Sequence, residues 1–219
     1  MSDILVHMAA AGVNDKNIFS EKIFEVNIFK SVKLLNNAIK SKCLNWLIIG
    51  SSSEYGRTAE RVKTLSKFSK TLPISNYAIS KAIFSNLSIE LAKKFNCKCR
   101  IMRLFPTYGP DEKKSRLWPS LVRAAKSGQN FYIKNPFENR NFNHINDVSK
   151  ILLNATNFKK KGKKFPQIWH VSCNKALSVK NFAKKVWKDH QATGKLYFAK
   201  DKNKKNLNHV SDKNSIWKI

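Results

Sequence analysis

Short apolar runs alternate with longer amphipathic stretches through the first half of this chain of 219 residues. Residues 3–12, 45–50 and 99–105 form the apolar runs, whereas residues 20–42 and 76–95 carry apolar side chains at helical spacing. A continuous apolar run is typical of a strand buried on both faces, and helices between such strands are the crossovers of a parallel sheet. The order predicts an α/β fold with a doubly wound parallel sheet, in which ligands bind beyond the carboxyl ends of the strands.

The second half of the chain has a less regular pattern. We expect helices near residues 117–127, from residue 146 and near 178–187, and strands near residues 131–133 and 167–172. Ser178 precedes an apolar stripe and is expected to cap the last helix. This half therefore predicts a smaller region appended to the sheet.

The charge of the chain is strongly positive, since 42 Lys and Arg residues face 14 Asp and Glu residues and give a net charge of +28. Such a charge attracts polyanions, including nucleic acid. The sequence has neither a paired Cys/His zinc spacing nor an aromatic RNA-binding motif. We therefore favour a lysine-rich solvated surface over a basic nucleic-acid-binding protein.

Four cysteines, Cys43, Cys97, Cys99 and Cys173, occur in a sequence with no secretory leader. This predicts free thiols and a cytoplasmic protein, because disulfides are rare in reducing compartments. One residue separates Cys97 from Cys99, whereas zinc and redox pairs usually have two, so we expect no metal site. The apolar runs are too short to cross a bilayer, and we expect no membrane partner.

Tyr77 and Lys81 stand four residues apart in a predicted helix, so their side chains share one face. A lysine cation beside a phenol lowers the pKa of the tyrosine, which would let Tyr77 exchange a proton with a hydroxyl near neutral pH. By itself the spacing favours a pair of surface residues, because a tyrosine and a lysine at this spacing occur by chance on many amphipathic helices. The segments around the pair decide between these interpretations.

Residues 50–56 read Gly-Ser-Ser-Ser-Glu-Tyr-Gly and follow a predicted buried strand. Their hydroxyls would lie where a parallel sheet binds its ligands, although a serine-rich turn is the plain alternative. Together with the downstream Tyr-x-x-x-Lys pattern, this segment resembles the extended short-chain dehydrogenase/reductase family, also called the NAD-dependent epimerase/dehydratase family.

Other segments resemble this family in the same order along nearly the whole chain. Residues 6–10 are similar to its fourth strand, and Asn27 lies in a segment similar to the following helix. Residues 103–110 resemble its Arg-x-x-x-x-Tyr-Gly-Pro segment, and residues 140–148 resemble its Arg-Asp-Phe-x-His-Val-x-Asp-Val segment.

The resemblance implies a partial Rossmann-like sheet that lacks the first strand-helix units. Residues 1–109 would form a partial dinucleotide-binding domain, and residues 110–219 a smaller substrate-binding region interleaved with it. The long helices at residues 20–42 and 76–95 would pack against a second copy in a homodimer.

The resemblance also implies roles for individual residues. Ser51 would hydrogen-bond the reacting oxygen, Tyr77 would donate or accept the proton, and Lys81 would hold the nicotinamide ribose. The dinucleotide, NAD or NADP, would contact these three residues and Met8, Ala9, Ala10, Ala11, Gly12, Val26 and Phe105. The substrate, a nucleotide-diphosphate sugar, would contact Ser52, Pro106 and Arg140.

Arg140 would meet the diphosphate of the substrate, a task that suits the forked guanidinium group. The alternative is a surface arginine that pairs with Glu138 or Asp147.

The sequence departs from the family at three places. The glycine-rich turn after the first strand is absent, which corresponds to about sixty residues ahead of Met1 and would weaken dinucleotide binding. Pro106 stands where many members have an asparagine. Ser52 and Ser53 replace the Asp-Glu pair with which family dehydratases expel water, and serine cannot perform that step at neutral pH.

We therefore expect an NAD(P)-dependent epimerase or keto-reductase that acts on a nucleotide-diphosphate sugar, in the synthesis of surface polysaccharide. The main alternative is a non-catalytic remnant, or one piece of a split enzyme that a separate N-terminal fragment completes.

Overall fold

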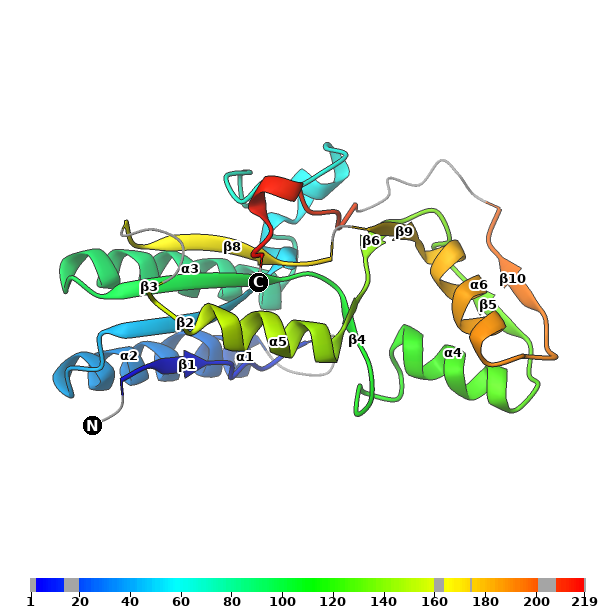
Figure 1. Ribbon diagram of the computed structural model, residues 1–219, viewed down its shortest axis with the longest axis horizontal. Coiled ribbons are helices and arrows are strands. Elements are labelled where there is room, and N and C mark those ends of the chain that lie inside the picture. The colour runs from blue at the N-terminus through cyan, green and yellow to red at the C-terminus, as the bar shows by residue number, and fades with distance from the viewer. Residues whose placement is uncertain (1–2, 14–19, 160–163, 174, 201–207, 219) are drawn as a thin grey trace.

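The computed structural model describes residues 3–13, 20–159, 164–173, 175–200 and 208–218. Its main sheet has four strands in the order β1-β2-β3-β8, and every neighbouring pair is parallel (Figure 1). The strands are β1 Leu5–His7, β2 Asn45–Ser51, β3 Lys98–Leu104 and β8 Gln167–Val171. The predicted doubly wound parallel sheet is confirmed.

Helices cover both faces of this sheet (Figure 1). The helices are α2 Ser31–Lys40 and α3 Asn76–Lys94 on one face and α5 Ile145–Ala155 on the other. Trp46 and Ile48 of β2 enter the core beneath α2 and α3, whereas Leu47 and Ile49 enter the core beneath α5. Both faces of β2 are thus buried, which explains why its sequence is a continuous apolar run.

The predicted helix at residues 20–42 has three parts, namely α1 Ser20–Phe24, the π-helical turn η1 Glu25–Lys30, and α2. In the π-helical turn, the Ser31 hydroxyl donates a hydrogen bond of 2.9 Å to the carbonyl of Val26. Such turns are rare and often occur at functional sites. This one places Asn27 in the interior, where the sequence pattern alone did not put it.

Beyond Gly109 the chain builds a second region around α4 Leu117–Lys126 and α6 Val179–Asp189 (Figure 1). Ser178 accepts a hydrogen bond of 3.1 Å from the Asn181 amide and caps α6, as predicted. The strands of this region pair as β5 Phe131–Ile133 with β10 Leu196–Phe198, β6 Asn139–Asn141 with β9 Ala176–Ser178, and β4 Thr107–Tyr108 with β7 Asn143–His144. Of these only β5 was predicted, because strands of two or three residues carry little periodic pattern.

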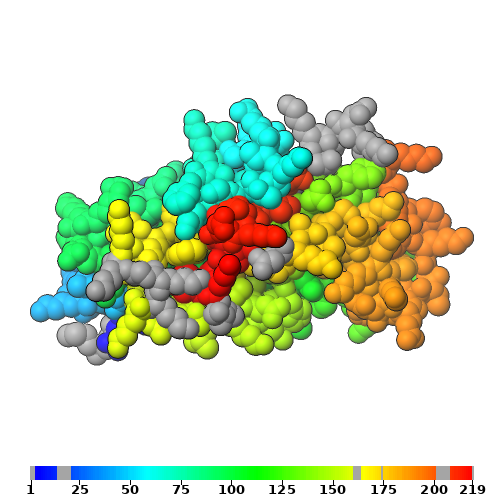
Figure 2. All heavy atoms as spheres, turned by 45° about the horizontal axis from the view of Figure 1, so that its top comes forward, coloured from blue at the N-terminus to red at the C-terminus, as the bar shows by residue number. Residues whose placement is uncertain are grey.

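The C-terminal segment, residues 208–218, lies across both regions. His209 pairs with Arg140, Ser211 with Leu65 and Ile216 with His170. Figure 2 shows this segment in red, next to the cyan loop that contains Leu65. Although α5, β8 and this segment follow residue 109, all three return to the main sheet, so the two regions are interleaved along the chain. The domain boundary at residue 109 stays a prediction.

None of the helices in the described ranges is long and apolar enough to cross a membrane.

Candidate active site

Ser51 lies at the carboxyl end of β2, where the strand passes into the 3-10 helix η2 Ser52–Tyr55. Its hydroxyl accepts a hydrogen bond of 3.2 Å from the Ser53 amide, and its own amide donates one of 2.8 Å to Oε1 of Glu54. This reciprocal capping box satisfies amides that would otherwise lack partners. The local sequence therefore holds Ser51 in one conformation at the ligand-binding end of the sheet.

Tyr77 lies in the first turn of α3, which begins after Ser75 caps the helix with a hydrogen bond of 3.2 Å from the Ala78 amide. The phenol is half-buried. Burial raises the pKa of Tyr77, while a hydrogen bond with the Ser51 side chain acts in the opposite direction. Ser51 and Tyr77, both predicted to contact the reacting oxygen, therefore lie together in the structure.

Lys81 is buried one turn further along α3, with an exposed fraction of 3%. Its ammonium donates to the carbonyl of Ile49 in β2. Burial lowers the pKa of Lys81, and the negative charge of Glu54 opposes this shift. The prediction that the Lys81 cation lowers the Tyr77 pKa is wrong for this structure, because burial outweighs every interaction that stabilises the phenolate.

The loop of mostly small residues after β1 is linked to α3 through Asn27. Met8, Ala9 and Ala10 are exposed, and Gly12 has a φ of 80°, a conformation that glycine adopts readily. The side chain of Asn27 forms two hydrogen bonds with the backbone of this loop. Its side chain accepts from the Ala11 amide at 2.7 Å and donates to the Ala11 carbonyl at 3.0 Å.

Asn27 also connects this loop to the helix of Tyr77. Its amide group donates to the Ser80 hydroxyl at 2.9 Å, and that hydroxyl donates to the Tyr77 carbonyl at 2.8 Å. Val26, in the same π-helical turn, is half-buried. The predicted cofactor-binding residue Ala11 is thus connected through Asn27 to the predicted catalytic helix, and Val26, also predicted to bind the cofactor, directly precedes Asn27 in the chain.

Two other predicted site residues follow β3. The ring of Phe105 is buried, and its centre lies 4.8 Å from that of His170. The side chain of Phe105 is therefore occupied by the core and faces no open surface. Pro106 is half-buried, and its carbonyl accepts two hydrogen bonds from Asn143, at 2.9 Å from the amide and 3.1 Å from the side chain.

Ser52 and Arg140 meet at His209, which sequence reasoning missed. The Ser52 hydroxyl lies 3.2 Å from Nδ1 of His209. Burial, together with the positive charge of Arg140, lowers the pKa of His209 to about 4. Because 157 positions separate Ser52 from His209, no local pattern could have revealed this contact.

The guanidinium of Arg140 pairs with the carboxylate of Glu138. This pairing is the alternative that the sequence left open for Arg140. The Arg140 Nε is nevertheless buried without a hydrogen-bond partner among the described residues, which is uncommon for a buried donor.

Arg116 lies at the start of α4, and its positive charge acts on Tyr77. It forms an ion pair of 2.6 Å with Glu112, whose pKa is raised by burial. Sequence reasoning missed both residues, because they lie in the irregular loop after Gly109. As to metals, no group of three or more His, Cys, Asp or Glu residues that could hold one occurs in the part of the chain that the structure describes.

Comparisons with known proteins identify the family and the fold. A model of the NAD dependent epimerase/dehydratase family matches residues 1–171. Among solved structures, the UDP-N-acetylglucosamine 4-epimerase of Methanobrevibacter ruminantium M1, in complex with UDP-N-acetylmuramic acid, superimposes with a TM-score of 0.84 at 17% identity. The match covers 96% of this chain and 67% of that one.

Two further solved structures of this fold are a 4-epimerase and a 4,6-dehydratase. The UDP-glucuronic acid 4-epimerase of Bacillus cereus, in complex with UDP-glucuronic acid and NAD, has a TM-score of 0.81 at 20% identity, over 96% of this chain and 66% of that one. The dTDP-glucose 4,6-dehydratase of Bacillus anthracis, in complex with NAD, has a TM-score of 0.78 at 16% identity, over 97% and 66%. At these identities the likeness establishes the fold, and the reaction must be argued from the site.

Proposed function

This chain belongs to the NAD-dependent epimerase/dehydratase family. We propose that it acts as an NAD(P)-dependent epimerase or keto-reductase on a nucleotide-diphosphate sugar. The observation that carries this proposal is the meeting of Ser51 with Tyr77 at the carboxyl end of β2, with Lys81 buried one helical turn away. A hydroxyl, a phenol and an ammonium at this place suit proton exchange with a sugar hydroxyl. We place the enzyme in the cytoplasm, in the synthesis of surface polysaccharide.

The residues divide the work of one oxidation or reduction. Ser51 hydrogen-bonds the reacting oxygen and orients it toward Tyr77. Tyr77 takes the hydroxyl proton as the sugar becomes a ketone and returns it as the ketone becomes a hydroxyl. The dinucleotide, when bound, supplies the hydride acceptor and donor for the carbon atom. Lys81, buried one helical turn from Tyr77, holds the nicotinamide ribose when the dinucleotide is bound.

The residues present fit one half of a dinucleotide. The exposed small side chains of Ala9 and Ala10 leave the backbone open to a flat ring, and the charge of Lys81 acts on His7, the last residue of β1. For the pyrophosphate the case differs, because the seven glycines of the sequence include no Gly-x-x-Gly-x-x-Gly turn. We propose that the nicotinamide half binds here, and that a glycine-rich turn outside this sequence holds the pyrophosphate.

An epimerase or reductase fits this site better than a dehydratase. Loss of water from a sugar needs an acid and a base beside the hydroxyl residue, and Ser52 and Ser53 occupy those positions. The carboxylate of Glu54, which follows Ser53, is fully buried and paired with Arg103. It therefore has no access to a substrate.

For the substrate we propose contacts with Ser52, Pro106 and Arg140. Arg140 is engaged with Glu138, so a diphosphate would have to compete with that carboxylate for the guanidinium or share the guanidinium with it. An arginine fork has donors enough for two anions.

The second candidate function is a non-catalytic remnant or one piece of a split enzyme, and the missing glycine-rich turn favours it. In the described part of the chain, β1 has a neighbouring strand on one side only. An open parallel edge of this kind can accept another strand. We propose this edge as the contact for a separate N-terminal fragment that carries the turn.

We also propose a homodimer through the helices at residues 20–42 and 76–95. Phe29, next to α2, and Ile83 and Leu87 on α3 are exposed, with exposed fractions of 71%, 40% and 38%. Exposed large apolar side chains on both helices support a contact between helices.

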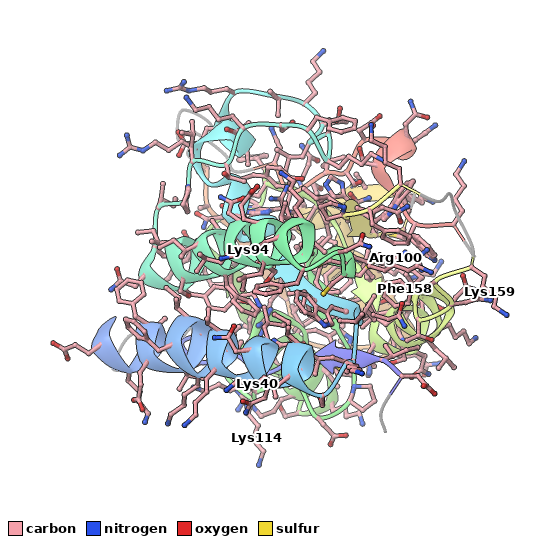
Figure 3. The ribbon with its side chains drawn as sticks, turned by 90° about the vertical axis from the view of Figure 1, so that its left-hand side faces the viewer. Lys40, Lys94, Arg100, Lys114, Phe158 and Lys159 are labelled. Carbon is pink, nitrogen blue, oxygen red and sulfur yellow. The ribbon has the colours of Figure 1, made fainter. Side chains whose placement is uncertain are left out.

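The test is a titration of the purified chain with NAD(H), followed by nicotinamide fluorescence or calorimetry. Lys81→Ala should weaken binding, because it removes the buried cation of the site. Lys94→Ala is the matched control, since Lys94 lies exposed at the far end of the same helix (Figure 3). Saturable binding that only Lys81→Ala weakens would support the enzyme, whereas no binding at millimolar cofactor would favour the remnant or the split protein.

A further inference from the structure

A fully buried carboxylate, that of Glu54, lies directly beneath Ser51. Its exposed fraction is 0%. Oε1 accepts the Ser51 amide at 2.8 Å and the Ser85 hydroxyl of α3 at 3.2 Å, and Oε2 accepts Nε of Arg103 at 2.9 Å. One carboxylate thus joins the strand end that carries Ser51, the helix that carries Tyr77, and β3.

The register of the sheet brings Arg103 to Glu54. Gly50 of β2 is the direct partner of Arg103 in β3. A Cβ atom on Gly50 would lie 2.7 Å from Oε1 of Glu54 and 3.1 Å from Cγ of Arg103, so only glycine leaves room for the pair. Burying two charges is costly, and a chain keeps such a pair only when the geometry repays the loss of water.

The charge of Glu54 acts on two proposed catalytic groups. Burial raises the pKa of Tyr77, and the charge of Glu54 raises it further. Burial lowers the pKa of Lys81, and the same charge opposes that shift. The other groups that face Tyr77 are Ser51 from β2 and the Arg116 cation at the start of α4.

A chain of hydrogen bonds leads from this pair toward the substrate region. Nη1 of Arg103 donates to the Tyr55 hydroxyl at 2.8 Å, and that hydroxyl lies 2.6 Å from Nε2 of His170. Nδ1 of His170 lies 2.7 Å from the hydroxyl of Ser211, in the C-terminal segment. The Ser211 amide donates to the side chain of Asn141, next to Arg140.

We propose that Glu54, held in place by Arg103, is the positioning residue of this site: it fixes Ser51 at the end of β2 and sets the electrostatic environment of Tyr77 and Lys81. This role deepens the proposed function and rests on it. Glu54 touches neither substrate nor cofactor, and it acts through the three residues around it. The hydrogen-bonded chain through Tyr55 and His170 ties its position to that of the C-terminal segment.

The first experiment follows the ionisation of Tyr77 in the unliganded full chain, by NMR of isotope-labelled tyrosine. Tyr77→Phe identifies the signal. In Glu54→Gln the Tyr77 transition should move to lower pH, because the negative charge that disfavours the phenolate is gone. Glu90→Gln removes an exposed carboxylate from the same helix and should leave the transition in place.

A second experiment follows amide hydrogen exchange at Ser51. Glu54→Ala removes the acceptor of the Ser51 amide, and exchange should accelerate about tenfold. Ser85→Ala removes one donor to Glu54 and should leave exchange at Ser51 unchanged. If Glu54→Gln does not fold because the Arg103 cation is left unpaired, the double variant Glu54→Gln with Arg103→Met removes both charges, and the same downward move of the Tyr77 transition is expected.

An unchanged Tyr77 transition in a folded variant without the Glu54 charge would overturn the proposal and leave a purely structural ion pair. Neither readout needs bound dinucleotide or turnover. If the transition moves while NAD(H) fails to bind, the proposed function is wrong and the electrostatic assignment of Glu54 stands.

Discussion

The Tyr55 hydroxyl lies 2.6 Å from Nε2 of His170, although 115 positions separate the two residues. Burial, assisted by the positive charges of Arg103 and Lys67, lowers the pKa of His170 to about 3. The imidazole is therefore neutral in the folded protein at physiological pH, and each of its two nitrogens has a partner.

The depressed pKa of His170 predicts loss of stability on mild acidification. Below the ordinary histidine pKa of 6.5, His170 binds a proton in the unfolded chain, whereas in the folded chain it binds one only near pH 3. The free energy of unfolding therefore falls as the pH drops from 6.5 towards 3. The loss from His170 should reach about 2 kcal/mol at pH 5. Urea unfolding at pH 7 and pH 5 measures it.

His170→Asn is the comparison for that measurement. It removes the titrating ring, so the difference in stability between the two pH values should shrink. An equal difference in both proteins would show that His170 does not titrate as expected. His209, whose pKa is lowered to about 4, contributes in the same direction and remains in both proteins.

Arg100 donates hydrogen bonds to backbone carbonyls at the C-terminal end of α5, and its replacement should destabilise the fold. Its Nη1 donates to the carbonyls of Ala155 at 2.7 Å and Asn157 at 2.9 Å, and the guanidinium lies 4.6 Å from the ring centre of Trp217. Figure 3 shows Arg100 next to Phe158, at the end of the molecule where Lys40 and Lys94 lie. Arg100→Met should cost about 3 kcal/mol, because buried carbonyls lose their donor.

Chemical denaturation of Arg100→Met against Arg123→Met measures this cost. Arg123 is exposed on α4, so its replacement should change stability by less than about 0.5 kcal/mol. Equal stabilities for the two variants would contradict the role assigned to Arg100.

Gly50→Ala should destabilise the protein and disturb the Glu54 site. The new methyl group would lie 2.7 Å from the Glu54 carboxylate and 3.2 Å from a methyl group of Ile101, and both neighbours are buried. Overpacking of this kind costs about 1–3 kcal/mol. Thermal unfolding gives the cost, and a melting temperature equal to that of the wild type would show that the strand ends have room to spare.

Asn27→Asp should loosen the loop that follows β1. An aspartate can still accept the Ala11 amide but cannot donate to the Ala11 carbonyl or to Ser80, which Asn27 does at 3.0 and 2.9 Å. Amide exchange of residues 8–12 should accelerate, and any NAD(H) affinity should fall about tenfold. Asn36→Asp, on the exposed side of α2, is the control, and equal effects of the two changes would contradict the prediction.

Much of the fold could be predicted because the responsible patterns are local. The apolar runs identified β2 and β3, and the helical spacing identified α3 and the overall span of α1 to α2. The Tyr-x-x-x-Lys spacing put Tyr77 and Lys81 on one helix. The π-helical turn was not predicted, since it differs from an α-helix in hydrogen bonding and not in composition.

The sequence by itself determined the parallel sheet, the placement of Ser51 at a strand end and the helix that carries Tyr77, because periodicity and capping act between near neighbours. Only the tertiary structure decided that Lys81 reaches the Ile49 carbonyl, that Arg140 pairs with Glu138 beside His209, and that Arg103 holds Glu54. These contacts depend on the register between strands and on where the C-terminal segment returns. Partners so far apart in the chain meet through packing of the whole domain, and burial then shifts their pKa values.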